Sequence, residues 1–338
     1  MRQASLAKGI EMRTIAVPGV SFTIPVIGFG CSSLAGVGEK KAQQLLATAF
    51  DAGVRHFDVA RYYGYGEAER MLGTFIKSRR GEITITTKFG LEPPRRTSAL
   101  RLAMQAARRL VQVVPATRGF LKRRAQGLVT GGKFSAQDAR NSLETSLREL
   151  GTDCIDFFLL HEYTASENSP DELVAFLQDV VQAGKIRYFG LGTDIKDTLR
   201  TLESHPELGA VVQIENSVLR RNLKTLPQGG PQRLTITHGA LAASFQAVTT
   251  FLRANPKVEQ NWSEKLAVDC ARDEIISALM LNYSAQANTD GLILFSSRDA
   301  SRVKKNAKAV LEPEFSPVQV ELFAQFVKRD MMAASSPE

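Results

Sequence analysis

The sequence predicts an α/β fold, a (β/α)8 TIM barrel, on the basis of three observations. Eight short runs rich in β-branched and aromatic residues alternate with segments of helical periodicity, the order that builds a parallel sheet covered by helices. The run 154–161 is apolar at almost every position, as expected for a strand buried on both faces. An open doubly wound sheet would show a Gly-x-Gly-x-x-Gly turn after an early strand. Gly28, Phe29 and Gly30 are instead followed by Cys-Ser-Ser, which favours the barrel.

The first expected element is a β-hairpin over residues 12–25. Two β-branched runs flank Pro18 and Gly19, a pair typical of turns. A short strand closing in Gly30 then begins the barrel. The expected barrel strands are 27–30, 54–59, 82–89, 154–161, 186–192, 210–215, 234–237 and 291–296.

Cap signals delimit several of the expected helices. Gly53, Gly151 and Gly184 each follow a helical segment, where glycine commonly ends a helix. Ser135 and Asp138 form an N-cap pair at the start of another helix. The expected helices are 41–52, 66–77, 135–151, 169–184, 196–204, 264–287, 300–310 and 317–328. We expect residues 1–338 to form one barrel domain.

The charge is distributed unevenly. The formal net charge is +8, yet the segment 90–133 alone holds ten Lys and Arg against one acidic residue, Glu92. The positive net charge therefore comes from one insertion, and it says little about the rest of the chain. Because this insertion follows the third barrel strand, we expect it at the mouth of the barrel, where active sites form.

Residues 98–114 of this insertion can form an amphipathic helix. Leu102 and Leu110 share one face, while Arg101 and Arg108 share the opposite face. Three interpretations stay open: a lid that selects anionic or large substrates, a basic surface helix that contacts a partner or an anionic lipid surface, and a helix that packs its apolar face on the barrel. No segment resembles a nucleic-acid-binding module.

Cysteine content and hydropathy bound the environment of the chain. Cys31, Cys154 and Cys270 are an odd and widely spaced set, with neither metal-ligand spacing nor a disulfide framework. No apolar run reaches the roughly 20 residues of a membrane-spanning helix, and the basic N-terminus lacks the apolar stretch of a secretory signal. We therefore expect a cytoplasmic protein without a transmembrane segment or a metal site.

Four residues that together can carry out proton transfer lie in the first half of the chain. Asp58, Tyr63, Lys88 and His161 each stand at or just beyond the end of an expected strand. The ends of parallel barrel strands converge on one mouth, so these side chains are expected to meet there. A phenol, an ammonium, a carboxylate and an imidazole in one place make a general acid together with groups that tune it.

The segment GVRHFDVARYYGYGEAERMLG (53–73) resembles the signature of the aldo-keto reductase superfamily. That signature is a strand, an Asp, a five-residue step to a Tyr, then a Gly and a Glu that lead into a helix. The step from Asp58 selects Tyr63 rather than Tyr62. Lys88 and His161 end the next two strands, so the four members of that family's catalytic tetrad have counterparts in order. The resemblance covers roughly residues 12–330 and includes a hairpin plug at the bottom of the barrel.

The resemblance implies a reversible hydride transfer between a nicotinamide and an aldehyde, ketone, sugar or alcohol. Tyr63 would be the general acid and base, and Asp58 would hold Lys88 charged and oriented. Lys88 would lower the pKa of the phenol, whose unperturbed value is about 10. His161 would orient the carbonyl oxygen. The cofactor would supply the hydride, and the protein would orient the substrate and provide the electrostatic environment of the reaction.

The resemblance also assigns residues to the cofactor. On the nicotinamide side these are Gly30, Cys31, Asp58, Thr193, Gln213 and His238. The family's Ser-Asn pair falls on Gly192 and Thr193, and its stacking aromatic falls near His238, so both positions depart from the pattern. We expect the rest of the substrate pocket to come from residues 90–133, 216–232 and 245–262.

The segment FSSRDASRVKKNAKAV (295–310) is similar to the family's segment for the adenosine 2′-phosphate and pyrophosphate. It gives Ser297, Arg298, Arg302 and Asn306 as contacts, because a helix N-terminus with arginines suits a phosphate. The arginines favour NADP (NADPH), with NAD still possible because Ser296 stands where the family usually has Lys.

Two other functions are compatible with the same residues. The altered positions at Gly192 and His238 suit a slow nucleotide-binding sensor or scaffold that keeps the aldo-keto reductase fold. A barrel lyase would instead use Lys88 as a Schiff base. The retention of all four tetrad residue types favours the reductase.

Overall fold

The computed structural model describes residues 13–17, 21–34, 36–93, 132–165, 170–227 and 233–332. The chain begins with two short antiparallel strands, β1 (Thr14–Ala16) and β2 (Thr23–Pro25), in which Ile15 is paired with Ile24. The expected hairpin is therefore confirmed. The guanidinium of Arg13 donates to the main-chain oxygens of Ala285 and Thr289, which ties the hairpin to the C-terminal part of the chain.

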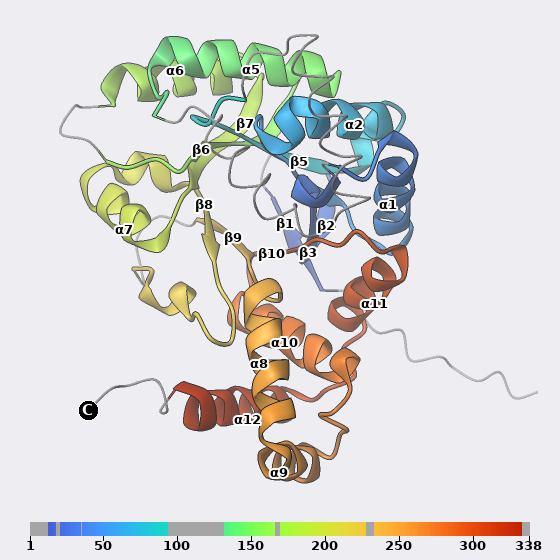
Figure 1. Ribbon diagram of the computed structural model, residues 1–338. Helices are drawn as coiled ribbons and strands as arrows, with labels where there is room; N and C mark the ends of the chain where they lie inside the picture. Colours follow the sequence, from blue (N-terminus) through green and yellow to red (C-terminus); the bar gives the residue numbers. More distant parts are fainter. Residues whose placement is uncertain are drawn as a thin grey trace, which may run out of the picture.

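Eight parallel strands close into a barrel in the order β10, β3, β4, β5, β6, β7, β8, β9 (Figure 1). Each of the eight expected strands is present, so the predicted barrel is confirmed. The strands are β3 (Ile27–Gly30), β4 (His56–Asp58), β5 (Thr84–Phe89), β6 (Ile155–His161), β7 (Ile186–Gly192), β8 (Val211–Glu215), β9 (Leu234–His238) and β10 (Leu292–Phe295). The register pairs Gly30 with Asp58 and His161 with Gly192, so the carboxyl ends of these strands lie at one rim.

Helices cover the outside of the barrel and extend it on one side. Figure 1 shows α5 and α6 at one end of the molecule and α8, α9 and α12 at the other. The helices are α1 (Glu39–Asp51), α2 (Glu67–Ile76), α5 (Ala136–Leu150), α6 (Asp171–Gln182), α7 (Ile195–Ser204), α8 (Ala242–Ala254), α9 (Pro256–Leu266), α10 (Asp273–Ala287), α11 (Ala300–Leu311) and α12 (Pro317–Val327). The expected cap of α5 is present, since the amide of Asp138 donates to the Ser135 hydroxyl.

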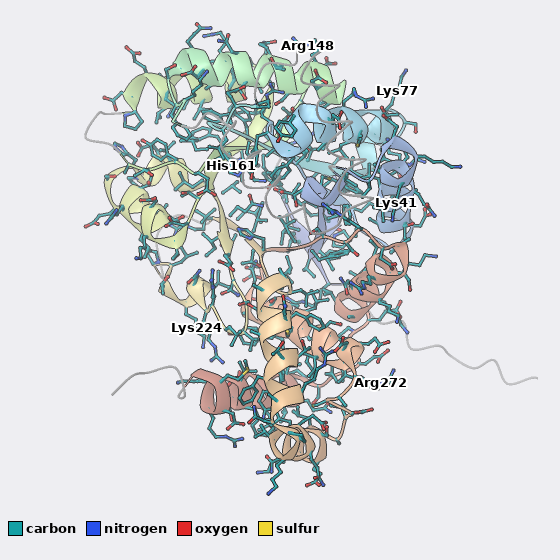
Figure 2. All side chains as sticks on the ribbon, viewed as in Figure 1. Lys41, Lys77, Arg148, His161, Lys224 and Arg272 are labelled. Carbon is teal, nitrogen blue, oxygen red and sulfur yellow. The ribbon has the colours of Figure 1, made fainter. Side chains whose placement is uncertain are left out.

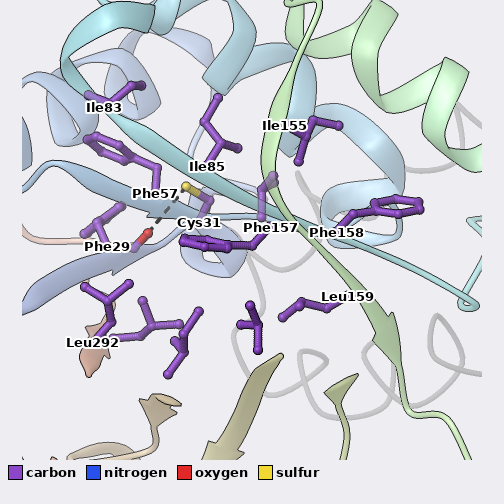
Figure 3. Packing of buried hydrophobic residues seen from close by; sticks show 14 of the residues in the cluster. Phe29, Cys31, Phe57, Ile83, Ile85, Ile155, Phe157, Phe158, Leu159 and Leu292 are labelled. Atoms are coloured by element: carbon purple, nitrogen blue, oxygen red, sulfur yellow. Dashed lines mark hydrogen bonds between the residues drawn. The ribbon is translucent and has the colours of Figure 1, made fainter. Parts of the chain in front are cut away.

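The main core fills the barrel and the layer between strands and helices. Phe29, Phe57 and Phe157 are fully buried on three barrel strands, and Figure 3 shows them beside Cys31. Close strand packing requires a glycine at position 190, because a Cβ there would lie 1.9 Å from the main-chain oxygen of Val211. These apolar contacts hold the rim of the barrel rigid beneath the polar residues described below.

The expected single helix over 264–287 is wrong. Helix α9 ends at Leu266, Ala267 adopts a left-handed conformation (φ 55°), and α10 begins only at Asp273. Periodicity alone missed this break, which the Ser263 hydroxyl stabilises by accepting a hydrogen bond from the Cys270 amide. Helix α8 was not expected.

Helices α8, α9, α10 and α12 form a second apolar cluster. Trp262 is fully buried, and its ring centroid lies 5.9 Å from that of Phe323 and 5.7 Å from that of Phe326. Its indole N–H donates to the Asp330 carboxylate. Residues 94–131, which include the expected helix 98–114, lie outside the described residues. No helix within the described ranges is long and apolar enough to cross a membrane.

Candidate active site

A cavity of about 560 Å³ opens at the carboxyl ends of the barrel strands. This is the size of pocket that holds a small ligand. Figure 2 shows His161 toward the inside of the barrel ribbon, whereas Lys41, Lys77 and Arg148 lie on its periphery. The residues that line the cavity are Gly30, Ser32, Asp58, Tyr62, Tyr63, Lys88, His161, Glu162, Gly192, Thr193, Asp194, Gln213, Glu215, His238, Gly239, Ala240, Leu241, Ala242, Leu294, Phe295 and Ser296. All four expected tetrad residues are among them.

A buried ion pair forms the floor of this cavity. Lys88 Nζ lies 2.7 Å from both carboxylate oxygens of Asp58 and 3.2 Å from the main-chain oxygen of Val59. The amide nitrogen of Gln213 donates to the same carboxylate at 2.8 Å. Asp58, Lys88 and Gln213 end or lie near the ends of β4, β5 and β8, so three strands contribute to one hydrogen-bonded group.

The turn after β4 brings Tyr63 over this pair. Gly64, Tyr65 and Gly66 adopt left-handed conformations in succession, with φ of 59°, 58° and 82°. This tight reversal leads into α2 and leaves the Tyr63 ring with its centroid 5.3 Å from Lys88 Nζ. The ring of His161 lies edge-on to the Tyr63 ring, with centroids 6.1 Å apart.

The phenol of Tyr63 is held in its protonated form. Burial, followed by the charge of Asp58, raises the pKa of Tyr63 well above its usual value. This direction is opposite to the sequence expectation that Lys88 would lower the pKa. The physical reason is first the burial of the phenol and then the charge of Asp58, since both disfavour the phenolate, while the Lys88 ammonium that would favour it contacts both oxygens of Asp58.

The imidazole of His161 is neutral. Burial first, then the charges of Lys88 and His238, hold its pKa well below the usual range. Its Nδ1 is buried and has no hydrogen-bond partner within the described part of the chain. Since buried polar atoms are normally paired, this nitrogen is an exception among the residues that line the cavity.

The residues assigned to a nicotinamide divide into two groups. Gly30, Thr193, Gln213 and His238 line the cavity together with Asp58. Cys31 does not line it, since its thiol is fully buried and directed toward the Phe29 carbonyl oxygen. Gln213 uses its nitrogen for Asp58, which leaves its side-chain oxygen as an acceptor, and the Thr193 hydroxyl donates to the Tyr163 carbonyl oxygen at 3.1 Å.

The residues assigned to the adenosine end lie outside this cavity. The loop after β10 is tied to the loop after β3, because Arg298 Nε donates to Ser33 O and the Ser33 hydroxyl donates to Ser297 O. Arg302 is exposed on α11, whereas Asn306 is buried. The carboxylate of Asp299 accepts from the Arg302 amide and so caps α11. An anion at this end would therefore contact arginine side chains more than free helix amides.

The sequence analysis missed several residues that line the cavity. Tyr62 lies with its ring centroid 5.0 Å from Tyr63 and 5.1 Å from His161. Glu162 lines the cavity and has a left-handed backbone (φ 55°). Asp194 also lines it and directly follows Thr193, which was expected to contact the nicotinamide. Each directly follows or precedes an identified residue, so adjacency at the strand ends was the available signal.

The expected pocket walls need a correction. No residue of the expected wall 245–262 lines the cavity, because α8 and α9 pack in the second apolar cluster. The described part of 216–232 is likewise not among the lining residues. Residues 239–242, which follow β9 and include the first residue of α8, take that place. The expected wall 90–133 lies mostly outside the described residues.

Two known proteins illustrate the sequence similarity of the chain to oxidoreductases. It is 30% identical over 201 residues to the aldo-keto reductase yakc of Schizosaccharomyces pombe, a match covering 58% of the chain and 50% of that protein. The chain thus spans about half the length of this relative. It is 25% identical over 323 residues to L-galactose dehydrogenase of Arabidopsis thaliana, covering 90% of the chain and 89% of that protein.

Solved structures share the fold at low sequence identity. Glycerol dehydrogenase AKR11B4 of Gluconobacter oxydans superposes with a TM-score of 0.71 at 16% identity, covering 96% of this chain and 97% of its own. An aldo-keto reductase of Klebsiella pneumoniae, solved in complex with NADPH, gives 0.64 at 19% identity, covering 94% and 95%. The model of the Aldo/keto reductase family matches residues 26–228. Because that match covers more than half of the sequence, the chain belongs to the Aldo/keto reductase family.

Proposed function

We propose that the protein is an NADP(H)-dependent oxidoreductase that interconverts a carbonyl compound and an alcohol. The observation that carries the proposal is the placement of a protonated phenol, Tyr63, beside the buried Asp58–Lys88 pair and the neutral His161 in one cavity. A carbonyl that accepts hydride develops negative charge on its oxygen, and a positioned proton donor lowers that barrier. The nicotinamide cofactor supplies the hydride.

Each polar residue has a distinct role in this proposal. Tyr63 donates its proton to the developing alkoxide in reduction. The alcohol product is a far weaker acid than the phenol, so a raised phenol pKa still leaves this transfer favourable. Lys88 is held by Asp58 below the ring and fixes the local field. His161, uncharged, contacts the carbonyl oxygen through a ring nitrogen and sets its orientation.

The residues present fit a nicotinamide dinucleotide. The Gln213 side-chain oxygen and the Thr193 hydroxyl suit a carboxamide, because both are neutral hydrogen-bonding groups at the cavity wall. Arg298 and Arg302 suit a phosphate beyond it. The name of the Schizosaccharomyces pombe relative specifies NADP(+), and the Klebsiella pneumoniae structure contains NADPH, which supports NADP over NAD.

The substrate class we propose is a small aldehyde, ketone or sugar. Relatives named D-threo-aldose 1-dehydrogenase (Pseudomonas sp) and L-galactose dehydrogenase act on sugars by their names, and the neighbour from Gluconobacter oxydans is a glycerol dehydrogenase. The polar cavity wall, with Glu162, Asp194 and Thr193, offers acceptors for hydroxyl groups.

The test is cofactor turnover by the purified chain and by Tyr63→Phe. NADPH and NADH oxidation would be followed by absorbance with a panel of aldehydes, ketones and sugars, and the reverse reaction with alcohols. Loss of turnover by roughly 10²- to 10⁴-fold in Tyr63→Phe, with unchanged NADPH affinity, is the expected result. Tight cofactor binding without turnover of any substrate in either direction would refute the proposal.

A further inference from the structure

A buried carboxylate that the proposed chemistry does not use lies behind the cavity. Glu69 is on α2, and its side chain is 0% exposed among the apolar residues of that helix face. Burying a carboxylate costs several kcal/mol unless it is paired and hydrogen-bonded. Its partners therefore show what this residue holds in place.

Three donors from three different parts of the chain converge on Glu69. One oxygen accepts from the hydroxyls of Thr87 on β5 and Ser146 on α5, both at 2.7 Å. The other oxygen accepts from Arg61 Nη1 at 3.0 Å. Helices α2 and α5 come close enough for this because position 73 is a glycine, where a Cβ would lie 2.4 Å from the main-chain oxygen of Glu149.

These donors adjoin the residues that the proposed function needs. Thr87 precedes Lys88 on β5, and since successive strand residues face opposite sides, Thr87 points to the helices while Lys88 points into the barrel. Arg61 lies between Asp58 and Tyr63 in the turn after β4. One carboxylate thus joins the strand that carries the lysine to the turn that carries the tyrosine.

The turn has a conformation that needs such support. Tyr65 holds a left-handed backbone between two left-handed glycines, which is uncommon for a residue with a side chain. The main-chain hydrogen bonds of the turn include those from Tyr63 N to Ala60 O and from Tyr65 N to Tyr62 O, both 3.0 Å, and the Glu67 amide donates to the oxygens of Gly64 and Tyr63. The Arg61 side chain, 11% exposed, adds an anchor to the protein interior.

Arg61 has one further charged neighbour. Its Nη2 lies 3.8 Å from Glu92, and its Nε is buried without a partner in the described part of the chain. The guanidinium is thus committed to two carboxylates of the protein, and it is not among the residues that line the cavity. It cannot act on a substrate directly from this position.

We propose that Arg61 and Glu69 are positioning residues that set the distance between the Tyr63 phenol and the Asp58–Lys88 pair. The inference rests on the proposed function, because it assigns a purpose to the position of Tyr63. It goes beyond stability, because a buried ion pair can often be replaced by uncharged residues without loss of stability.

The test uses the double variant Arg61→Met with Glu69→Gln. The amide introduced by Glu69→Gln keeps an oxygen that accepts from Thr87 and Ser146, and the thioether introduced by Arg61→Met leaves no buried charge unpaired. We therefore expect the double variant to fold, whereas Arg61→Met alone or Glu69→Gln alone would leave a buried charge unpaired and is expected to unfold. The matched control is Arg70→Met on the same helix, α2, which removes an exposed ion pair with Glu39 on α1. Thermal unfolding, NADPH affinity, kcat, KM and amide hydrogen exchange of residues 59–66 would be measured on each full-length variant.

The expected result separates position from stability. In the double variant, kcat falls on the order of 10²-fold, as for a misplaced catalytic group, while NADPH affinity and the unfolding temperature stay near those of the parent. Exchange of the 59–66 amides becomes faster, and Arg70→Met changes kcat by no more than about twofold. Arg61→Lys with native Glu69 restores part of the lost kcat.

A double variant that unfolds at the parent's temperature, turns over at the parent's rate and exchanges at the parent's rate would overturn the inference. If the parent chain turns over no substrate, the proposed function fails. The exchange rate of residues 59–66 then still decides whether Arg61 and Glu69 hold the turn.

Discussion

Lys88 Nζ contacts both carboxylate oxygens of Asp58 at 2.7 Å, and Gln213 fills a further acceptor position on the same carboxylate. The side chains of Lys88 and Asp58 are 3% and 5% exposed, so their opposite charges compensate each other with little access to water. Burial of the phenol, followed by the charge of Asp58, raises the pKa of Tyr63, and the paired Lys88 does not reverse this direction. The pair acts on the phenol mainly by fixing its surroundings.

The first prediction concerns removal of one member of this pair. Lys88→Met leaves the Asp58 carboxylate buried with Gln213 as its remaining side-chain donor, which should lower the free energy of unfolding by about 3–5 kcal/mol and abolish turnover. Urea unfolding measures the first effect and cofactor oxidation the second. Lys185→Met, which removes an exposed ion pair with Glu144, is the control and should cost less than about 1 kcal/mol.

Adding Asp58→Asn to Lys88→Met removes the unpaired charge and should recover most of the stability without recovering turnover. Equal stability of Lys88→Met and the parent would show that the carboxylate is not buried and paired as described.

The second prediction concerns the pH dependence of turnover. The pKa of Tyr63 is raised and that of His161 is lowered, so both groups are uncharged between about pH 6.5 and 10. The kcat of carbonyl reduction should be flat over this range, since the phenol stays protonated. The kcat of alcohol oxidation should rise with pH, because the phenolate is then the base.

Initial rates in both directions between about pH 6 and 10 would test this. A decline of the reductive kcat centred near about pH 7 or 8 would mean that the charge of Lys88 dominates at Tyr63, or that another group is the acid.

Much of the fold and the centre of the site follow from sequence because they depend on local pattern. All eight strands were identified from apolar and β-branched runs, and barrel topology predicts that their ends meet. The resemblance to the family's signature then selects the four tetrad residues at those ends. The Arg61–Glu69 pair was not identified, since a charged residue on the buried face of α2 looks like an ordinary surface glutamate until α5 packs against it. The direction of the Tyr63 pKa also depends on burial and three-dimensional pairing, which no spacing rule contains.

The third prediction concerns Glu162, whose charge contributes to the raised pKa values of both Tyr62 and Tyr63. Glu162→Gln removes a negative charge near the phenols, so the pKa of Tyr63 should fall. In the oxidative direction the rise of kcat should then occur at lower pH than in the parent. Glu172→Gln, at an exposed position in the first turn of α6, is the control and should leave the profile unchanged. A rise at the same or a higher pH in Glu162→Gln would contradict the assignment.

The fourth prediction concerns acid stability. His56 is fully buried between the hydroxyls of Thr84 and Thr86, and burial lowers its pKa from 6.5 to about 4. Between these two values the unfolded chain takes up a proton at this residue and the folded chain does not. Stability should therefore fall through this window as pH falls, by about 3 kcal/mol from His56 alone.

Urea unfolding of the parent and of His56→Asn, which keeps hydrogen-bonding capacity but does not titrate, would isolate this contribution. The variant should lose less stability than the parent between pH 6.5 and about 4. The same loss in both proteins would assign the acid sensitivity to other groups.

The fifth prediction concerns the choice between NADPH and NADH. Arg302 is exposed on the first turn of α11, where the Asp299 carboxylate already caps the helix, so discrimination for a 2′-phosphate must come from side chains such as this one. Arg302→Gln should weaken NADPH binding by about ten- to a hundredfold, the size of one charge-assisted hydrogen bond, and leave NADH binding nearly unchanged. Fluorescence titration with each cofactor measures both dissociation constants without turnover.

The control is Lys308→Gln, later on the same helix and paired with Glu314. It removes the same charge away from the helix start and should change neither dissociation constant. Equal weakening of NADPH and NADH by Arg302→Gln would place Arg302 at a phosphate that both cofactors share, and an unchanged NADPH affinity would remove it from the site.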